Sequence, residues 1–147
     1  MITGVAHACF VVPDLERAVG FYRDKLGLTL AFEFKNDKGR RVGVYLRAGR
    51  RTFIELFEGK AGPAADGQSY SHICLEVDDI AATVEALHKR GVQVSGVALG
   101  SDQTYQAWLA DPDGNRIELH AYTPESWQDP WLTGTKKKQV AHLRRTS

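Results

Sequence analysis

The heptapeptide Arg51-Thr52-Phe53-Ile54-Glu55-Leu56-Phe57 decides how the rest of the chain is interpreted. The apolar and aromatic residues on both sides of Glu55 predict a buried strand. A carboxylate in such a strand is costly unless it is paired or binds a metal. The same tripeptide, Ile-Glu-Leu, returns 63 residues later as Ile117-Glu118-Leu119. Two carboxylates in matching settings indicate a duplicated structural unit.

Two histidines repeat with nearly the same spacing. His7 and His72 are 65 residues apart, and each is followed two positions later by a cysteine, Cys9 and Cys74. Because side chains alternate along a strand, each cysteine lies on the same face as its histidine. Each half of the chain therefore offers one histidine early and one glutamate late. Two histidines and two glutamates form a plausible ligand set for a divalent metal ion.

Each histidine strand is followed by the signals of a helix. Asp14 and Asp79 suit the N-cap position, and Gly27 and Gly91 suit the left-handed residue that ends a helix. Three strands are predicted after each helix. They cover residues 28–34, 42–47 and the Glu55 strand in the first half, and residues 92–99, 103–109 and the Glu118 strand in the second. We therefore predict the α+β fold class, with two tandem βαβββ modules.

The modules divide the chain into consecutive segments. Module 1 is expected at about residues 3–58 and module 2 at about 69–122, within one domain that spans residues 1–123. The Gly-, Pro- and Ala-rich residues 59–68 are expected to link the modules. Residues 124–147 are expected to form a C-terminal arm and a basic tail.

Composition limits the classes of partner. The chain has 147 residues, 43% hydrophobic and 25% charged, which is typical of a soluble globular protein. Its net charge of +1 gives no global attraction to nucleic acid or to a membrane surface. Two cysteines in different halves do not make a disulfide scaffold, and neither a signal-like start nor a long apolar run is present. We expect a cytoplasmic protein that binds neither nucleic acid nor a membrane.

Taken together, these motifs resemble the vicinal oxygen chelate superfamily, which includes glyoxalase I, methylmalonyl-CoA epimerase, extradiol dioxygenases, and fosfomycin and bleomycin resistance proteins. The resemblance covers about residues 4–122 and includes Ser71-His72-Ile73 and the run from Asp111-Pro112-Asp113-Gly114 to Leu119. It implies that the sheets of the two modules curl into an open barrel around a divalent ion (Ni, Zn, Mn, Co or Fe). The implied metal ligands are His7, Glu55, His72 and Glu118.

The number of ligands bears on the reaction. Extradiol dioxygenases and fosfomycin-modifying enzymes typically use two histidines and one glutamate, whereas bacterial-type glyoxalase I uses all four ligands. The resemblance thus implies a metal-dependent lyase or isomerase that moves a proton through a metal-stabilised enediolate on a small vicinal-oxygen substrate. Glu118 would carry the proton, with Glu55 serving the opposite face. The alternatives are an Fe(II)-dependent ring-cleavage dioxygenase that uses His7, His72 and Glu118, and a metal-free drug-sequestering resistance protein.

The sequence departs from bacterial-type glyoxalases at two positions where those enzymes hold glutathione. They place an arginine four residues after the first histidine and an asparagine four after the first glutamate. Here these positions are Val11 and Gly59. We therefore predict weak or no activity on the adduct of glutathione and methylglyoxal, despite a bound metal.

Strand alternation adds candidate pocket residues beside the ligands, for which a plain core role is the alternative. They are Cys9, Phe53, Phe57, Tyr70, Cys74, Gln106, Trp108 and His120. For the two glutamates, the alternative is ion pairing with Arg47, Arg51 or Arg116. Curled sheets leave edges exposed, and the arm carries Trp127 and Trp131, so we expect a homodimer. The barrel could form within one chain or between two subunits.

Overall fold

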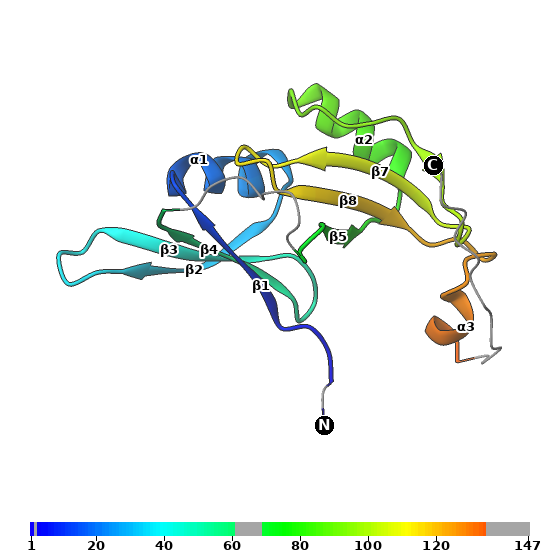
Figure 1. Ribbon diagram of the computed structural model, residues 1–147, viewed down its shortest axis with the longest axis horizontal. Coiled ribbons are helices and arrows are strands. Elements are labelled where there is room, and N and C mark those ends of the chain that lie inside the picture. The colour runs from blue at the N-terminus through cyan, green and yellow to red at the C-terminus, as the bar shows by residue number, and fades with distance from the viewer. Residues whose placement is uncertain (2, 61–68, 135–147) are drawn as a thin grey trace. The chain divides into compact units, whose positions relative to one another are not determined.

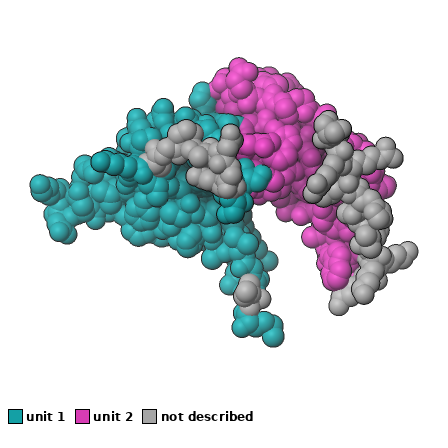
Figure 2. All heavy atoms as spheres, in the orientation of Figure 1, with its two compact units in different colours: residues 1–71, 110–115 teal, residues 72–109, 116–147 magenta. Residues whose placement is uncertain are grey.

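The computed structural model describes residues 1, 3–60 and 69–134. The chain divides into two compact units, drawn in different colours in Figure 2. Unit 1 is Met1–Ser71 with Ala110–Asn115, and unit 2 is His72–Leu109 with Arg116–Ser147. Most of the predicted linker and of the basic tail, residues 61–68 and 135–147, lies outside the described residues.

Unit 1 contains the predicted βαβββ module. Its elements are β1 (His7–Val12), α1 (Leu15–Val19), η1 (Gly20–Lys25), β2 (Thr29–Lys35), β3 (Arg41–Arg47) and β4 (Phe53–Glu58). The sheet order is β1-β4-β3-β2, with β1 parallel to β4 and the other neighbours antiparallel (Figure 1). The sheet is open, because β1 and β2 lie at its two ends.

The first helix begins at the predicted cap and changes winding halfway. The Asp14 carboxylate accepts a hydrogen bond from the Arg17 amide at 3.0 Å. From Gly20 the helix continues as the π-helix η1, where the Leu26 amide donates to the Phe21 carbonyl at 2.9 Å. Gly27, with φ of +83°, follows the helix as predicted.

The two faces of the unit 1 sheet differ in chemistry. One face packs apolar residues against α1; in the middle of it, Ile54 and Leu56 are fully buried. The opposite face carries Phe53, Glu55 and Phe57, which alternate with them along β4 and are partly exposed. The prediction of a strand around Glu55 is confirmed, and alternation places its carboxylate away from the apolar core.

Unit 2 repeats this order. Its elements are β5 (Ile73–Glu76), α2 (Ile80–Lys89), β6 (Ala98–Leu99), β7 (Tyr105–Ala110), β8 (Arg116–Ala121) and α3 (Asp129–Leu132). The sheet order is β5-β8-β7-β6, with β5 parallel to β8. Asp79 caps α2 by accepting from the Ala82 amide at 2.9 Å, and Gly91 has φ of +75°. The predicted duplication is thus confirmed.

The predicted strand over residues 92–99 is wrong in its extent. Only Ala98–Leu99 form β6, and Val94 makes a single bridge to Leu109. The physical reason lies at Ser95, whose hydroxyl accepts from the Trp108 amide at 2.9 Å. A side chain there takes the place of a backbone carbonyl and interrupts the ladder.

The predicted turn before β8 is held by the Asp111 carboxylate, which is buried. This carboxylate accepts from the amides of Asp113 and Asn115, each at 2.9 Å, while Gly114 takes a φ of +85°. It also accepts from the hydroxyl of Tyr22, at 2.9 Å. Burial raises the pKa of Tyr22, so this phenol stays protonated and remains a donor. The turn is therefore joined to the core of unit 1.

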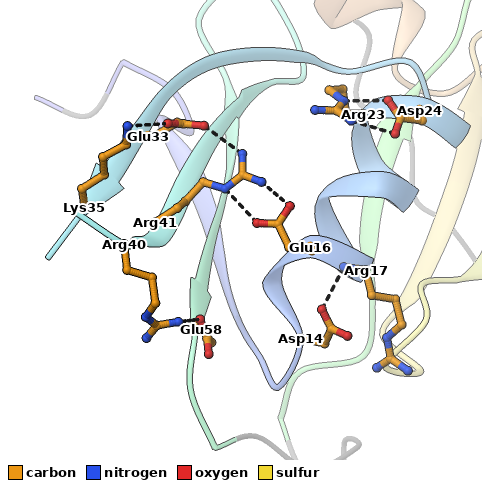
Figure 3. Close-up of polar contacts among 10 residues, drawn as sticks. All are labelled: Asp14, Glu16, Arg17, Arg23, Asp24, Glu33, Lys35, Arg40, Arg41 and Glu58. Carbon is orange, nitrogen blue, oxygen red and sulfur yellow. Dashed lines mark hydrogen bonds and ion pairs between the residues drawn. The ribbon is translucent and has the colours of Figure 1, made fainter. Parts of the chain in front are cut away.

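Ion pairs on the surface of unit 1 connect the helix with the sheet (Figure 3). Arg41 on β3 donates to both Glu16 on α1 and Glu33 on β2, the latter at 2.8 Å. The hydrogen bonds from Arg41 lower the pKa of Glu16. Exposed pairs of this kind contribute about 0–1 kcal/mol each. These ion pairs connect elements of unit 1 and do not include His7 or Glu55.

The described part of the C-terminal arm lies on unit 2. The Trp127 amide donates to the Asp102 carbonyl at 3.0 Å, and the Gln128 amide side chain donates to the Asp102 carboxylate at 2.6 Å. Ser126, which precedes these two residues, is buried, whereas Trp131 is 64% exposed. Among the described residues, no helix is long and apolar enough to cross a membrane.

Candidate metal centre

Unit 1 places one histidine beside one glutamate. Strands β1 and β4 are adjacent and parallel, and Cys9 on β1 stands opposite Glu55 on β4. His7 lies two residues before Cys9 on β1, opposite Phe53. His7 Nε2 lies 3.5 Å from Glu55 Oε2, and His7 Nδ1 lies 3.0 Å from the hydroxyl of Tyr45. The His7 side chain is 41% exposed and that of Glu55 only 14%. The imidazole is accessible, and Tyr45 orients it.

Unit 2 repeats the pair with the same register. Cys74 stands opposite Glu118 on the parallel strands β5 and β8, and His72 directly precedes β5. His72 Nε2 lies 3.0 Å from Glu118 Oε2. The rings of His72 and Trp108 pack edge to face, with centroids 4.9 Å apart. Glu118 is buried, so its carboxylate depends on these neighbours in place of water.

The second carboxylate has an additional partner. His120 Nδ1 lies 3.3 Å from Glu118 Oε1, and His120 is itself buried. The corresponding residue of unit 1, two positions after Glu55, is Phe57. Both units therefore contain the histidine–glutamate pair, and unit 2 adds His120 as a further partner of its glutamate.

The donor atoms of both pairs fit a divalent ion. Two ligands bound at about 2.1 Å to one tetrahedral or octahedral ion lie about 3.0–3.4 Å apart. The separations of 3.5 Å in unit 1 and 3.0 Å in unit 2 are close to this range. Imidazole and carboxylate are also the donor types that zinc, nickel, manganese and iron accept.

The alternative of arginine pairing receives no support in the part of the chain that the structure describes. There the ion pairs of Glu55 and Glu118 are made with histidines. Arg116 lies over the ring of Trp108, 4.7 Å from its centroid, and Arg47 donates to the carbonyl of Gly49 at 3.1 Å.

Most of the predicted pocket residues share a face with a glutamate. By register and alternation, Glu55 shares its face with Cys9, Phe53 and Phe57, and Glu118 shares its face with Cys74, Gln106, Trp108 and His120. Tyr70 is placed differently. Its ring stands edge-on to Phe10 at 6.2 Å, and Phe10 belongs to the buried core.

Sequence reasoning missed the aromatic rings that β2 and β3 add beside His7. Phe32 stacks on Tyr45 with centroids 4.6 Å apart and planes at 16°, and Phe34 packs on Phe57 at 4.9 Å. Phe32 is 49% exposed. Strand alternation could have predicted this position of Tyr45, because Tyr45 on β3 stands opposite Glu55 on β4 and so lies on the same face of the sheet.

Both cysteines are free thiols with weakened acidity. Burial raises the pKa of Cys9 to about 11, and a hydrogen bond to Glu55 adds to the rise. Cys74 keeps accessible surface, but partial burial of its thiol raises its pKa to about 12, with the charge of Glu118 as the next cause. At neutral pH both side chains are therefore neutral thiols.

The chain is similar to known proteins over most of its length. Residues 4–119 match the Glyoxalase/Bleomycin resistance protein/Dioxygenase superfamily, and the chain belongs to this superfamily. It is 32% identical over 121 residues to a lactoylglutathione lyase of Haemophilus influenzae, covering 78% of this chain and 90% of that protein. It is 32% identical over 126 residues to the metallothiol transferase FosB of Staphylococcus epidermidis, covering 83% and 84%.

A solved structure shares the fold at similar identity. It is TnmS3, an antibiotic binding protein from Streptomyces sp. CB03234, with a TM-score of 0.67 and 29% identity over 83% of this chain and 98% of that one. Relatives named as a lyase, a transferase and a binding protein are thus about equally similar to this chain. Overall similarity establishes the superfamily, and the residues of the site must discriminate among reactions.

Proposed function

We infer that this protein is a metal-dependent lyase or isomerase of the glyoxalase I type, acting on a small substrate with vicinal oxygens. The observation that carries the proposal is the repeated imidazole–carboxylate pair, at 3.5 Å in unit 1 and 3.0 Å in unit 2. The proposed ligands are His7, Glu55, His72 and Glu118. The superfamily resemblance supports this assignment, because enzymes with three ligands have none at the position of Glu55.

A bound divalent ion would supply Lewis-acid chemistry for the negative charge that develops on the substrate oxygens. Glu118 is the residue that we assign to proton transfer, since a base must lie within hydrogen-bond reach of the proton that it takes. Its Oε1 already contacts His120. While His120 holds Oε1, the other oxygen, Oε2, which lies 3.0 Å from His72 Nε2, would take up and return the proton. Glu55, with one histidine partner, would serve the opposite face of the substrate.

The exposed aromatic rings of unit 1 support binding of an apolar part of the substrate. Phe32 and Tyr45 form a stacked pair, and the hydroxyl of Tyr45 is bonded to His7. An apolar group on these rings would lie next to the proposed ligands. The same rings favour a second candidate function, the binding of a drug without turnover, which the likeness to an antibiotic binding protein also suggests.

The decisive experiment measures metal content and turnover of purified protein and of alanine variants at the four proposed ligands. Each substitution should lower the bound metal, and Glu118→Ala should also abolish turnover of hemithioacetals formed with a panel of thiols. Full metal occupancy and intact activity in Glu55→Ala, together with oxygen consumption on catechols, would favour the dioxygenase. Drug binding that is unchanged after chelation of all metal would favour the binding protein.

We also propose a homodimer located in the cytoplasm. The free thiols Cys9 and Cys74 suit a reducing compartment. The exposed ring of Trp131 and the open sheets offer apolar surface and strand edges that a second subunit would cover. Sedimentation should give twice the chain mass at micromolar concentration, and a monomer there would reject the dimer.

A further inference from the structure

Unit 2 brings together three ligand-type side chains, two of which, Cys74 and His120, lie outside the repeated histidine–glutamate pair. One ligand atom each of Cys74, Glu118 and His120 lies within 4.8 Å of the other two. Cys74 stands directly opposite Glu118 across β5 and β8. His120 follows Glu118 by two residues on β8, so all three side chains lie on one face of the sheet.

We propose that Cys74, Glu118 and His120 form a second metal site, selective for a thiophilic divalent ion such as Zn²⁺ or Cd²⁺, which shares only Glu118 with the proposed catalytic centre. The site needs neither His72 nor any residue of unit 1. Thiolate is the ligand that such ions prefer, and it is absent from the four ligands proposed for catalysis. Three protein ligands and one water complete a tetrahedral shell.

The group is already close to the geometry that such an ion requires. The donors of His120 and Glu118 are 3.3 Å apart, and both residues are buried, so two ligands are held in place. Cys74 is exposed, which leaves a path for an ion. Ligands at about 2.0–2.3 Å from a tetrahedral ion are separated by about 3.3–3.8 Å, so small side-chain rotations suffice.

Binding requires one balanced acid–base step. The S–H bond of Cys74 breaks, its proton passes to the buffer, and the sulfur lone pair forms the bond to the ion. No electron is transferred. The site should consequently release protons as it fills.

The duplication provides an internal control for the proposal. Cys9 stands opposite Glu55 with the same register as Cys74 opposite Glu118. The residue two positions after Glu55 is Phe57, so the donor corresponding to His120 is replaced by an apolar ring. Among the described residues, this group in unit 2 is the one in which three such donor atoms all lie within 4.8 Å of one another.

Because the second site shares Glu118 with the proposed catalytic centre, filling it should affect turnover, an expectation that rests on the proposed function. An ion held by Cys74 and His120 would withdraw Glu118 from proton transfer. Zn²⁺ or Cd²⁺ added in excess of the catalytic metal should then inhibit turnover, and Cys74→Ser should relieve that inhibition.

The test is a Cd²⁺ titration of the full-length, metal-free protein, followed by the ultraviolet thiolate-to-cadmium charge-transfer band and by proton release. The wild type should show the band with one ion per chain. Cys74→Ser should abolish it, and the matched Cys9→Ser should retain it. His120→Phe, which copies the residue of unit 1, should weaken binding about 100-fold or more, since loss of even an outer-shell partner costs about 10–100-fold.

Further variants separate this site from the proposed catalytic centre. His72→Ala should keep the cadmium band even where it loses the catalytic metal. Phe57→His should create a second band-forming site at Cys9. Loss of the band in His72→Ala, its persistence in Cys74→Ser, or unchanged affinity in both His120→Phe and the smaller His120→Asn, each with intact thermal unfolding, would overturn the proposal. These readouts do not depend on activity, so a failure of the proposed lyase function would leave them interpretable.

Discussion

The contact between Val11 and Gly59 gives a quantitative prediction about thiol specificity. A Cβ atom built on Gly59 would lie 2.7 Å from Cγ1 of Val11, closer than real side chains approach. The backbone brings them together, because the Gly59 amide donates to the carbonyl of Val12 at 2.9 Å. These are the two positions at which bacterial-type glyoxalases carry arginine and asparagine. The two departures from that pattern are therefore coupled through space.

The perturbations are Val11→Arg, Gly59→Asn and the double variant. One charge-assisted hydrogen bond contributes about 1.5–3 kcal/mol, so Val11→Arg should raise kcat/KM for the glutathione–methylglyoxal hemithioacetal about 10- to 150-fold. Gly59→Asn alone should lower the free energy of unfolding by about 1–2 kcal/mol, because its Cβ overpacks against the branched Val11. Val11 is 47% exposed and can rotate away, which keeps this cost moderate.

The double variant should recover stability, since arginine is unbranched at Cβ and leaves room for the asparagine. The assays are steady-state kinetics with metal content measured on the same samples, and urea unfolding for stability. Val11→Met is the matched control, because it removes the branch and adds no charge. A wild-type kcat/KM above about 10⁶ M⁻¹s⁻¹ on this adduct, or an equal gain in Val11→Met, would refute the reasoning.

Three further outcomes are expected. Tyr22→Phe should lower the free energy of urea unfolding by about 1–3 kcal/mol, because it removes the buried hydroxyl that donates to Asp111, whereas Tyr105→Phe on the surface should change little. Burial alone would raise the pKa of Asp102, but hydrogen bonds from Gln128 and Thr104 lower it overall. The stability that this contact contributes is therefore present above the ordinary aspartate pKa of about 4 and is lost as pH falls through the lowered pKa. Tryptophan fluorescence should follow release of the arm in that acid range, and Asp102→Asn should abolish the pH dependence. Removal of metal by a chelator should abolish turnover and divalent ions should restore it; activity that survives complete removal would contradict the proposed chemistry.

The fold and the histidine–glutamate pairs could be predicted because each rests on local periodicity repeated twice. Alternation around Glu55 predicts a strand with one apolar face, and the helix caps Asp14 and Asp79 are satisfied within three residues of themselves. Repetition of the same spacing in both halves then indicates that the histidines and glutamates belong to equivalent places. None of these inferences requires knowledge of which strand pairs with which.

The missed features all depend on register or on tertiary contacts. Tyr45 meets His7 across 38 residues of sequence, and only the pairing of β3 with β4 places it there. The hydroxyl of Ser95 accepts from the Trp108 amide in place of a backbone carbonyl, and this contact lies between the bridge at Val94 and β6. Tyr70 follows the alternation that predicts a pocket residue, but it precedes the start of β5 at Ile73, and its ring stands edge-on to Phe10.

The two units keep one backbone plan and differ in the chemistry of equivalent positions. In each unit an aromatic ring packs on the histidine, Tyr45 on His7 and Trp108 on His72. The residue two positions after the glutamate differs between the units: it is Phe57 in unit 1 and His120 in unit 2. A phenyl ring can only exclude water and contact apolar groups, whereas an imidazole can hold a carboxylate or an ion. Because backbone register is conserved between the units, this divergence changes which groups the equivalent position can contact: apolar groups at Phe57 and a carboxylate or an ion at His120. Exchange of these two side chains, through Phe57→His and His120→Phe, should therefore move cadmium affinity from one unit to the other while leaving both sheets folded.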